Sequence, residues 1–94
     1  MMRAAKKDAN HNEIDESFKS LGYRTQDLSQ LKNACDLLAI KGKKTFLVEI
    51  KDGSKPPSAR KLSQGEKAFA EKWDGIWVKI ESVNDVIILD KAVA

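Results

Sequence analysis

Residues 34–53, ACDLLAIKGKKTFLVEIKDG, contain two apolar segments joined by a short basic turn. Residues 36–40 and 44–51 are rich in apolar and β-branched side chains, which favours two β-strands. Between them, Gly42 and Lys43 suit a two-residue hairpin loop, because a glycine at the first loop position adopts the positive φ of a type II′ turn. The stretch therefore predicts an antiparallel hairpin.

The register of this hairpin places two carboxylates opposite each other. With a two-residue loop, or with the four-residue loop 41–44, Asp36 lies directly across from Glu49 at a Cβ separation of about 4.5 to 5.5 Å. The period of two along a strand puts Lys51 on the same face as Glu49. A three-residue loop would instead pair Leu37 with Glu49, which we consider the less favoured register. The hairpin thus predicts three charged groups at one end.

Two interpretations of this charged group are open. Both faces of the hairpin are otherwise largely apolar, so cover is expected on both sides, and adjacent buried carboxylates are costly unless a cation neutralises them. A hard divalent ion such as Mg²⁺ at Asp36 and Glu49 would do so and would activate a water for phosphodiester chemistry, with Lys51 orienting that water or stabilising the developing charge. Alternatively, the two carboxylates each pair with a lysine at an exposed strand end.

The rest of the chain alternates between predicted helices and strands. Apolar residues at helical spacing favour helices, strict alternation favours a strand, and the two prolines of the segment 52–61 exclude both. On these criteria we expect helices at 12–22, 62–73 and 82–89 and strands at 23–29, 36–40, 44–51 and 75–80. The sequence therefore predicts an α/β fold with the element order α-β-β-β-α-β-α.

Length and composition indicate one small domain. The 94 residues are 41% hydrophobic and 33% charged, which is typical of a globular chain too short for two cores. Cys35 is the single cysteine, so no intramolecular disulfide is available and a reducing, cytoplasmic setting is expected. No apolar run is long enough for a membrane span, and we expect no membrane association. Residues 1–9 are expected to form a flexible basic tail ahead of a domain at 10–94.

Basic residues concentrate in the middle of the chain. Residues 41–61 contain seven Lys or Arg and only two acidic residues, whereas both flanks are nearly balanced. Such a stripe is typical of proteins that bind a phosphate backbone. A solvated loop that only maintains solubility explains the charge equally well. On the first interpretation, the DNA-binding candidates are Lys55, Arg60 and Lys61.

Asp36, followed by VEIK with Glu49 and Lys51, resembles the D…(D/E)-x-K signature of the PD-(D/E)xK nuclease superfamily. The blocks ANHNEI, CDLLAI, FLVEIKDGSKPPSARKLSQGE and EKWDG together resemble the small standalone VRR-NUC-type nucleases of phages and bacteria, over residues 9–90. The resemblance implies a restriction-endonuclease-like core with a central mixed sheet flanked by helices. It further implies a Mg²⁺- or Mn²⁺-dependent endodeoxyribonuclease that acts on branched or flap DNA, such as Holliday junctions, in repair, in the cytoplasm of a bacterial or phage-infected cell.

The resemblance assigns roles to individual positions. Asp36 and Glu49 would be metal ligands together with the backbone carbonyl of Ile50, and Lys51 would be the catalytic lysine. Cys35 departs from the family, which usually has proline before the aspartate. Because that proline only shapes the strand entry, a small buried cysteine is an acceptable replacement.

Two helical glutamates have a second explanation. Glu13 matches the acidic residue of the first helix that assists the metal or its water, but it is also spaced for a capping box with Asn10. Glu66 stands where the family often has glutamine and faces inward, but it is likewise spaced for a capping box with Ser63. Glu66 and Gln64 are therefore auxiliary candidates whose roles stay open.

Three alternatives to a DNA nuclease are an inactive nuclease fold that only holds nucleic acid, a ribonuclease, and a subunit of a larger repair complex. The presence of Asp36, Glu49 and Lys51 together favours activity. A domain of this size is too small to hold two arms of a DNA junction, so we expect a C₂ homodimer. Candidates for the shared apolar patch are Ile76, Trp77, Ile88 and Leu89.

Overall fold

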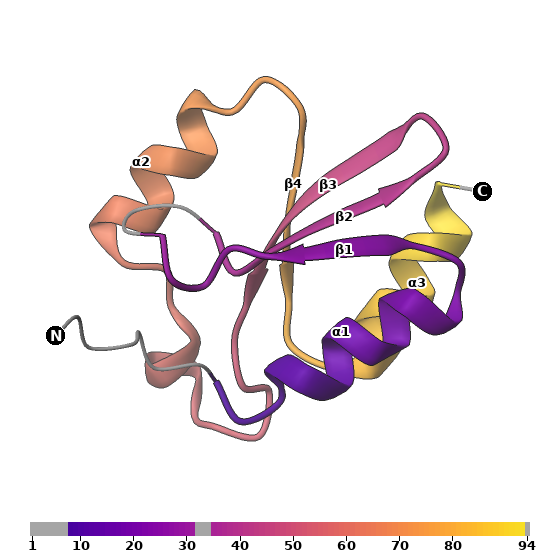
Figure 1. Cartoon of the computed structure of the whole chain (residues 1–94). Coiled ribbons are helices and arrows are strands. Elements are labelled where there is room, and N and C mark those ends of the chain that lie inside the picture. The colour runs from indigo at the N-terminus through magenta and orange to yellow at the C-terminus, as the bar shows by residue number, and fades with distance from the viewer. Residues whose placement is uncertain (1–7, 32–34, 94) are drawn as a thin grey trace, which may run out of the picture.

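The computed structural model describes residues 8–31 and 35–93. Most of the expected tail, residues 1–7, lies outside the described residues. Within these residues, three helices and four strands follow one another in the predicted order (Figure 1). They are α1 (His11–Ser20), β1 (Arg24–Asp27), β2 (Leu37–Lys41), β3 (Lys44–Ile50), α2 (Gln64–Lys72), β4 (Ile76–Ile80) and α3 (Val83–Ala92), with a 3₁₀ turn at Pro57–Arg60 before α2. The α/β class and the mixed sheet are thereby confirmed.

The four strands form one sheet in the order β1-β2-β3-β4. The first three strands are antiparallel, and β4 runs parallel to β3 because the chain crosses through α2 before it returns. Leu38 pairs with Leu47, and the loop consists of Gly42, with φ 61°, and Lys43. The predicted hairpin register is therefore confirmed.

The ends of the central strands differ from the prediction. The strands were expected at 36–40 and 44–51, but Asp36 precedes β2 and Lys51 follows β3. The backbone of Asp36 still donates to the carbonyl of Val48 at 3.0 Å, and that of Lys51 donates to the carbonyl of Ile80 at 3.0 Å. Both residues are thus held by the sheet while their side chains lie beyond its regular part.

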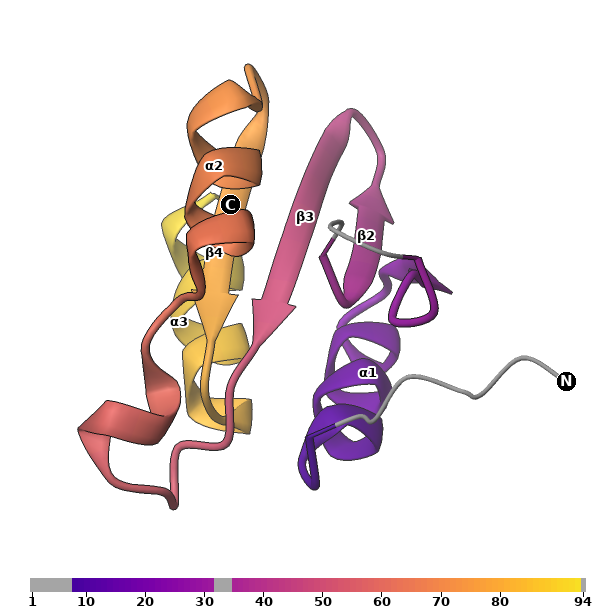
Figure 2. The same cartoon turned by 90° about the vertical axis from the view of Figure 1, so that its left-hand side faces the viewer.

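The two faces of the sheet are covered unequally. α1 and α3 lie on one face, where one apolar core contains the fully buried side chains of Ile14, Phe18, Phe46, Val48 and Val86. α2 lies on the other side, in front of β4 in Figure 2, and none of its residues is buried. The sheet face that carries Glu49 nevertheless buries Leu47 and Glu49, which are 6% and 4% exposed.

Of the helices in the described residues, none combines the length and the apolar character needed to cross a membrane.

Candidate active site

Asp36 and Glu49 lie together, as the hairpin register predicts. The backbone N–H of Ile50 donates to Oδ2 of Asp36 at 2.7 Å, which holds this carboxyl group at the end of β3. Glu49 is only 4% exposed and lies within hydrogen-bonding reach of Asp36 and of Glu66. Burial, together with these two neighbouring carboxyl groups, raises the pKa of Glu49. The pair therefore needs a proton or a cation between its oxygens.

The alternative of ion-paired strand ends does not describe this pair. Within residues 8–31 and 35–93, neither Asp36 nor Glu49 forms an ion pair with a lysine. Lys51 instead pairs with Glu66 of α2, with Nζ at 2.9 Å from Oε1 and 3.2 Å from Oε2. Burial lowers the pKa of Lys51, but the hydrogen bond and charge of Glu66 outweigh it, and the pKa is raised. Lys51 is thus a charged group beside the carboxylates.

Glu66 forms the capping box that its spacing allows and also binds Lys51. Its backbone N–H donates to Oγ of Ser63 at 3.1 Å, and the N–H of Ser63 donates to Oε1 of Glu66 at 2.7 Å, so the capping box is confirmed. Burial acts to raise the pKa of Glu66, but the hydrogen bonds from Ser63 and Lys51 outweigh it and the pKa is lowered. Glu66 therefore stays ionised. Gln64, also in the first turn of α2, is exposed.

The capping box with Asn10, the alternative interpretation of Glu13, is absent from the structure. Asn10 makes no side-chain cap on α1; its Nδ2 donates instead to the carbonyls of Lys51 and Glu81, both at 3.1 Å. Glu13 is exposed and, within the described residues, forms no hydrogen bond or ion pair with Asp36 or the residues around it. No contact with the candidate site therefore supports the catalytic role expected for Glu13. Asn10, in contrast, links the start of α1 to the backbone of Lys51 by a hydrogen bond.

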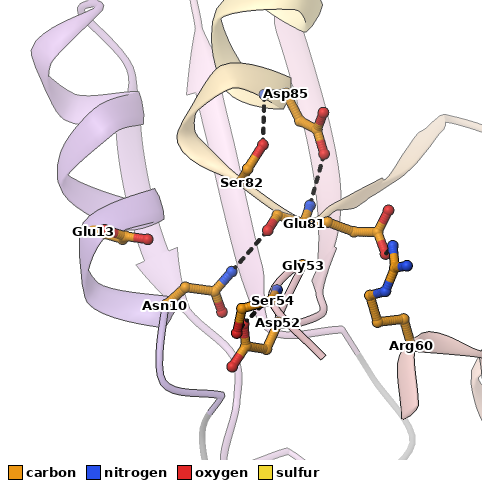
Figure 3. Close-up of a pocket in the computed structure, with 9 residues that line it drawn as sticks. All are labelled: Asn10, Glu13, Asp52, Gly53, Ser54, Arg60, Glu81, Ser82 and Asp85. Carbon is orange, nitrogen blue, oxygen red and sulfur yellow. Dashed lines mark hydrogen bonds and ion pairs between the residues drawn. The ribbon is translucent and has the colours of Figure 1, made fainter. Parts of the chain in front are cut away.

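Glu13 lines a separate cavity of about 400 Å³ near the starts of α1 and α3 (Figure 3). The cavity is acidic, since Asp52, Glu81 and Asp85 also line it. Arg60 lies at its edge and pairs with Glu81 at 2.9 Å. The Asp36–Glu49 pair is not part of this lining, so the candidate site lies outside this cavity.

The three DNA-binding candidates of the loop differ in their surroundings. Arg60 is held by Glu81 and by the carbonyl of Lys55, to which its Nε donates at 2.8 Å. Lys55 and Lys61 are exposed. The lysines are thus available for a phosphate contact, whereas Arg60 already has a carboxylate partner.

Sequence reasoning missed Asp8 as a neighbour of the site. Burial raises the pKa of Asp8, the charge of Asp36 raises it further, and the charges of Lys51 and Lys55 oppose these effects. Asp8 is therefore close enough to interact electrostatically with Asp36 and Lys51. No periodic pattern marks it, because it lies in the polar segment before α1.

The remaining candidates are placed as follows. Cys35 is buried, and burial raises the pKa of its thiol, which fits a packing role. Ile76 on β4 and Ile88 on α3 are 45% and 56% exposed, whereas Trp77 and Leu89 are half-buried.

The donor set at the carboxylate pair is compatible with a hard divalent ion. Asp36 and Glu49 supply carboxylate oxygens, and Ile50, whose carbonyl is the third candidate ligand, follows Glu49 in the chain. Among the described residues, no group of three or more Asp, Glu, His or Cys side chains is arranged to hold a metal. An ion here would depend on two carboxylates, a carbonyl and water, which is a coordination that Mg²⁺ accepts.

Comparisons of the chain with protein-family models, with curated proteins and with solved structures found no match. Fold and site together define a small α/β domain with a paired carboxylate and a lysine at one end of its sheet.

Proposed function

We propose that this protein is a metal-dependent nuclease that hydrolyses phosphodiester bonds in DNA, with a restriction-endonuclease-like core of the PD-(D/E)xK type. The observation that carries the proposal is the contact between Asp36 and the buried Glu49, with the ammonium group of Lys51 beside them. Two adjacent carboxyl groups with little exposure to water destabilise the fold unless a partner compensates their charge. A bound cation between the two carboxylates would compensate this loss of stability.

In this proposal, different residues bind the metal, stabilise charge and bind the DNA backbone. Asp36 and Glu49, with the carbonyl of Ile50, hold Mg²⁺ or Mn²⁺, which supplies an activated water and polarises the phosphodiester. Lys51 donates to a phosphate oxygen on which negative charge develops. Lys55 and Lys61, exposed on the loop that follows β3, bind the backbone phosphates on either side.

The preferred substrate in this proposal is branched DNA, and the active form is a homodimer. One domain has a radius of gyration of 12.9 Å, and the Asp36–Glu49 pair is the candidate site within its described residues. Two cuts in a two-fold symmetric junction require two sites with the same symmetry, which a C₂ dimer provides. Of the apolar residues expected at the contact, Ile76 and Ile88 are exposed.

The experiment is incubation with labelled junction, flap, duplex and single-stranded DNA, and with RNA of the same sequences, in Mg²⁺, Mn²⁺ or a chelator. The proposal expects cleavage of branched DNA with either metal and none with the chelator. Binding without cleavage would instead assign an inactive nuclease fold, and cleavage of RNA alone would assign a ribonuclease.

A further inference from the structure

The attachment of α2 to the rest of the molecule depends strongly on its first turn. No residue of α2 is buried, and its Phe69 stacks on Trp73, the residue that follows the helix, with ring centroids 6.4 Å apart. Trp73 remains 40% exposed. Apolar contacts hold α2 weakly. The polar contacts at its start therefore have a large influence on the position of its first turn.

One carboxylate joins the start of α2 to the candidate site. Oε1 of Glu66 accepts from the backbone N–H of Ser63 at 2.7 Å and from Nζ of Lys51 at 2.9 Å. The side chains of Lys51 and Glu66 are only 16% and 22% exposed, so water screens their attraction less than at an open surface. Any change in the helix start therefore moves the group that holds the lysine.

We propose that Glu66 is a positioning residue for Lys51, and that the N-cap Ser63 sets this position by fixing the first turn of α2. The inference rests on the proposed nuclease function. A lysine side chain has four flexible carbon–carbon bonds, and its ammonium group reaches a useful place only when a partner fixes it. The ammonium has three N–H donors, so the contacts with Glu66 leave one for a phosphate oxygen.

Two variants separate the charge of Glu66 from the helix cap. Glu66→Gln keeps a residue that completes a capping box but removes the charge that holds Lys51. Ser63→Ala keeps the charge but removes the hydroxyl that accepts from the N–H of Glu66. The matched control is Ser82→Ala, which removes the corresponding N-cap of α3, where Oγ accepts from the N–H of Asp85 at 3.3 Å.

The first readout is cleavage of junction DNA under steady-state conditions. A reacting group displaced by 1 Å can cost up to about 100-fold in rate, so we expect kcat to fall roughly tenfold in Glu66→Gln. We expect a fall of about two- to threefold in Ser63→Ala, since the loss of one cap only loosens a helix start. Ser82→Ala should leave kcat unchanged, and KM should stay constant throughout. An unchanged kcat in Glu66→Gln, or equal losses in Ser63→Ala and Ser82→Ala, would overturn the inference.

The second readout needs no activity. The proton–nitrogen NMR signal of the Lys51 ammonium group is observable when a hydrogen-bonded partner slows its exchange with water. We expect this signal in the wild type and in Ser82→Ala, a weaker one in Ser63→Ala and none in Glu66→Gln. Absence of cleavage by the wild type would refute the proposed nuclease function and leave this readout to decide the inference. A signal that persists in both Ser63→Ala and Glu66→Gln would refute the positioning role.

Discussion

The carboxyl group of Asp36 is held against that of Glu49, because its Oδ2 accepts the backbone N–H of Ile50 at 2.7 Å. The hydrogen bond fixes Asp36 at the point where the regular part of β2 begins and β3 ends. The side chain of Glu49 is buried, and the carboxyl group of Asp36 is its neighbour. This relationship is the basis of the nuclease proposal.

Lys51→Met should slow cleavage without weakening metal binding. The ammonium group acts only where charge develops, and removal of one electrostatic stabiliser costs about 2.7 to 4 kcal/mol in the transition state, or roughly 100- to 1,000-fold in kcat. The measurement is single-turnover cleavage together with Mn²⁺ titration by calorimetry. Wild-type kinetics in this variant would make Lys51 a structural partner of Glu66 only.

The basic loop should respond differently at its lysines and at its arginine. Lys55→Ala and Lys61→Ala should each weaken the binding of all DNA sequences alike and lower the slope of log K against log salt by about one. Arg60→Ala should leave that slope almost unchanged, because Arg60 is paired with Glu81. Fluorescence anisotropy over a salt series measures all three, and identical slopes for both lysine variants and the wild type would assign the loop to solubility.

Several features of the site follow from local sequence patterns, and others do not. The turn at Gly42 fixes the hairpin register, so the meeting of Asp36 with Glu49 was predictable from spacing alone. The Ser63 cap was equally visible as a motif. By contrast, Asn10 is spaced to cap α1, but it binds the carbonyls of Lys51 and Glu81, which lie 41 and 71 positions away in the sequence. Only the three-dimensional packing decides such a choice between a local and a distant partner.

Alkaline pH should destabilise the protein through Tyr23. Its hydroxyl donates to Oδ1 of Asp90 at 2.9 Å, and burial, with this carboxylate, raises the pKa of Tyr23 from 10.0 to about 12. Because the folded state keeps the proton to higher pH than the unfolded chain, the stabilising contribution is complete below pH 10 and is lost between about 10 and 12. Tyr23→Phe should cost about 1 kcal/mol at neutral pH and remove this alkaline loss. Urea unfolding at pH 7 to 11 measures both, and an unchanged pH dependence in the variant would contradict the assignment.

The dimer proposal predicts a solution mass of about twice 10.5 kDa. Ile88→Lys should convert the dimer to a monomer, since it introduces a charge at an apolar residue that is 56% exposed on α3. Ile40→Lys, a similar change at an exposed position of the hairpin, serves as the control and should remain dimeric. Light scattering after size exclusion at micromolar protein decides: a monomeric mass for the wild type, with and without junction DNA, would refute the dimer.

Glu49→Gln tests the central claim most directly. The substitution keeps the size of the buried side chain but removes the charge that holds the metal, while Glu71→Gln makes the same change at an exposed position of α2. The account predicts that Glu49→Gln abolishes Mg²⁺- and Mn²⁺-dependent cleavage of labelled junction DNA with DNA affinity near that of the wild type, and that Glu71→Gln cleaves normally. Cleavage by Glu49→Gln at the wild-type rate would contradict the account.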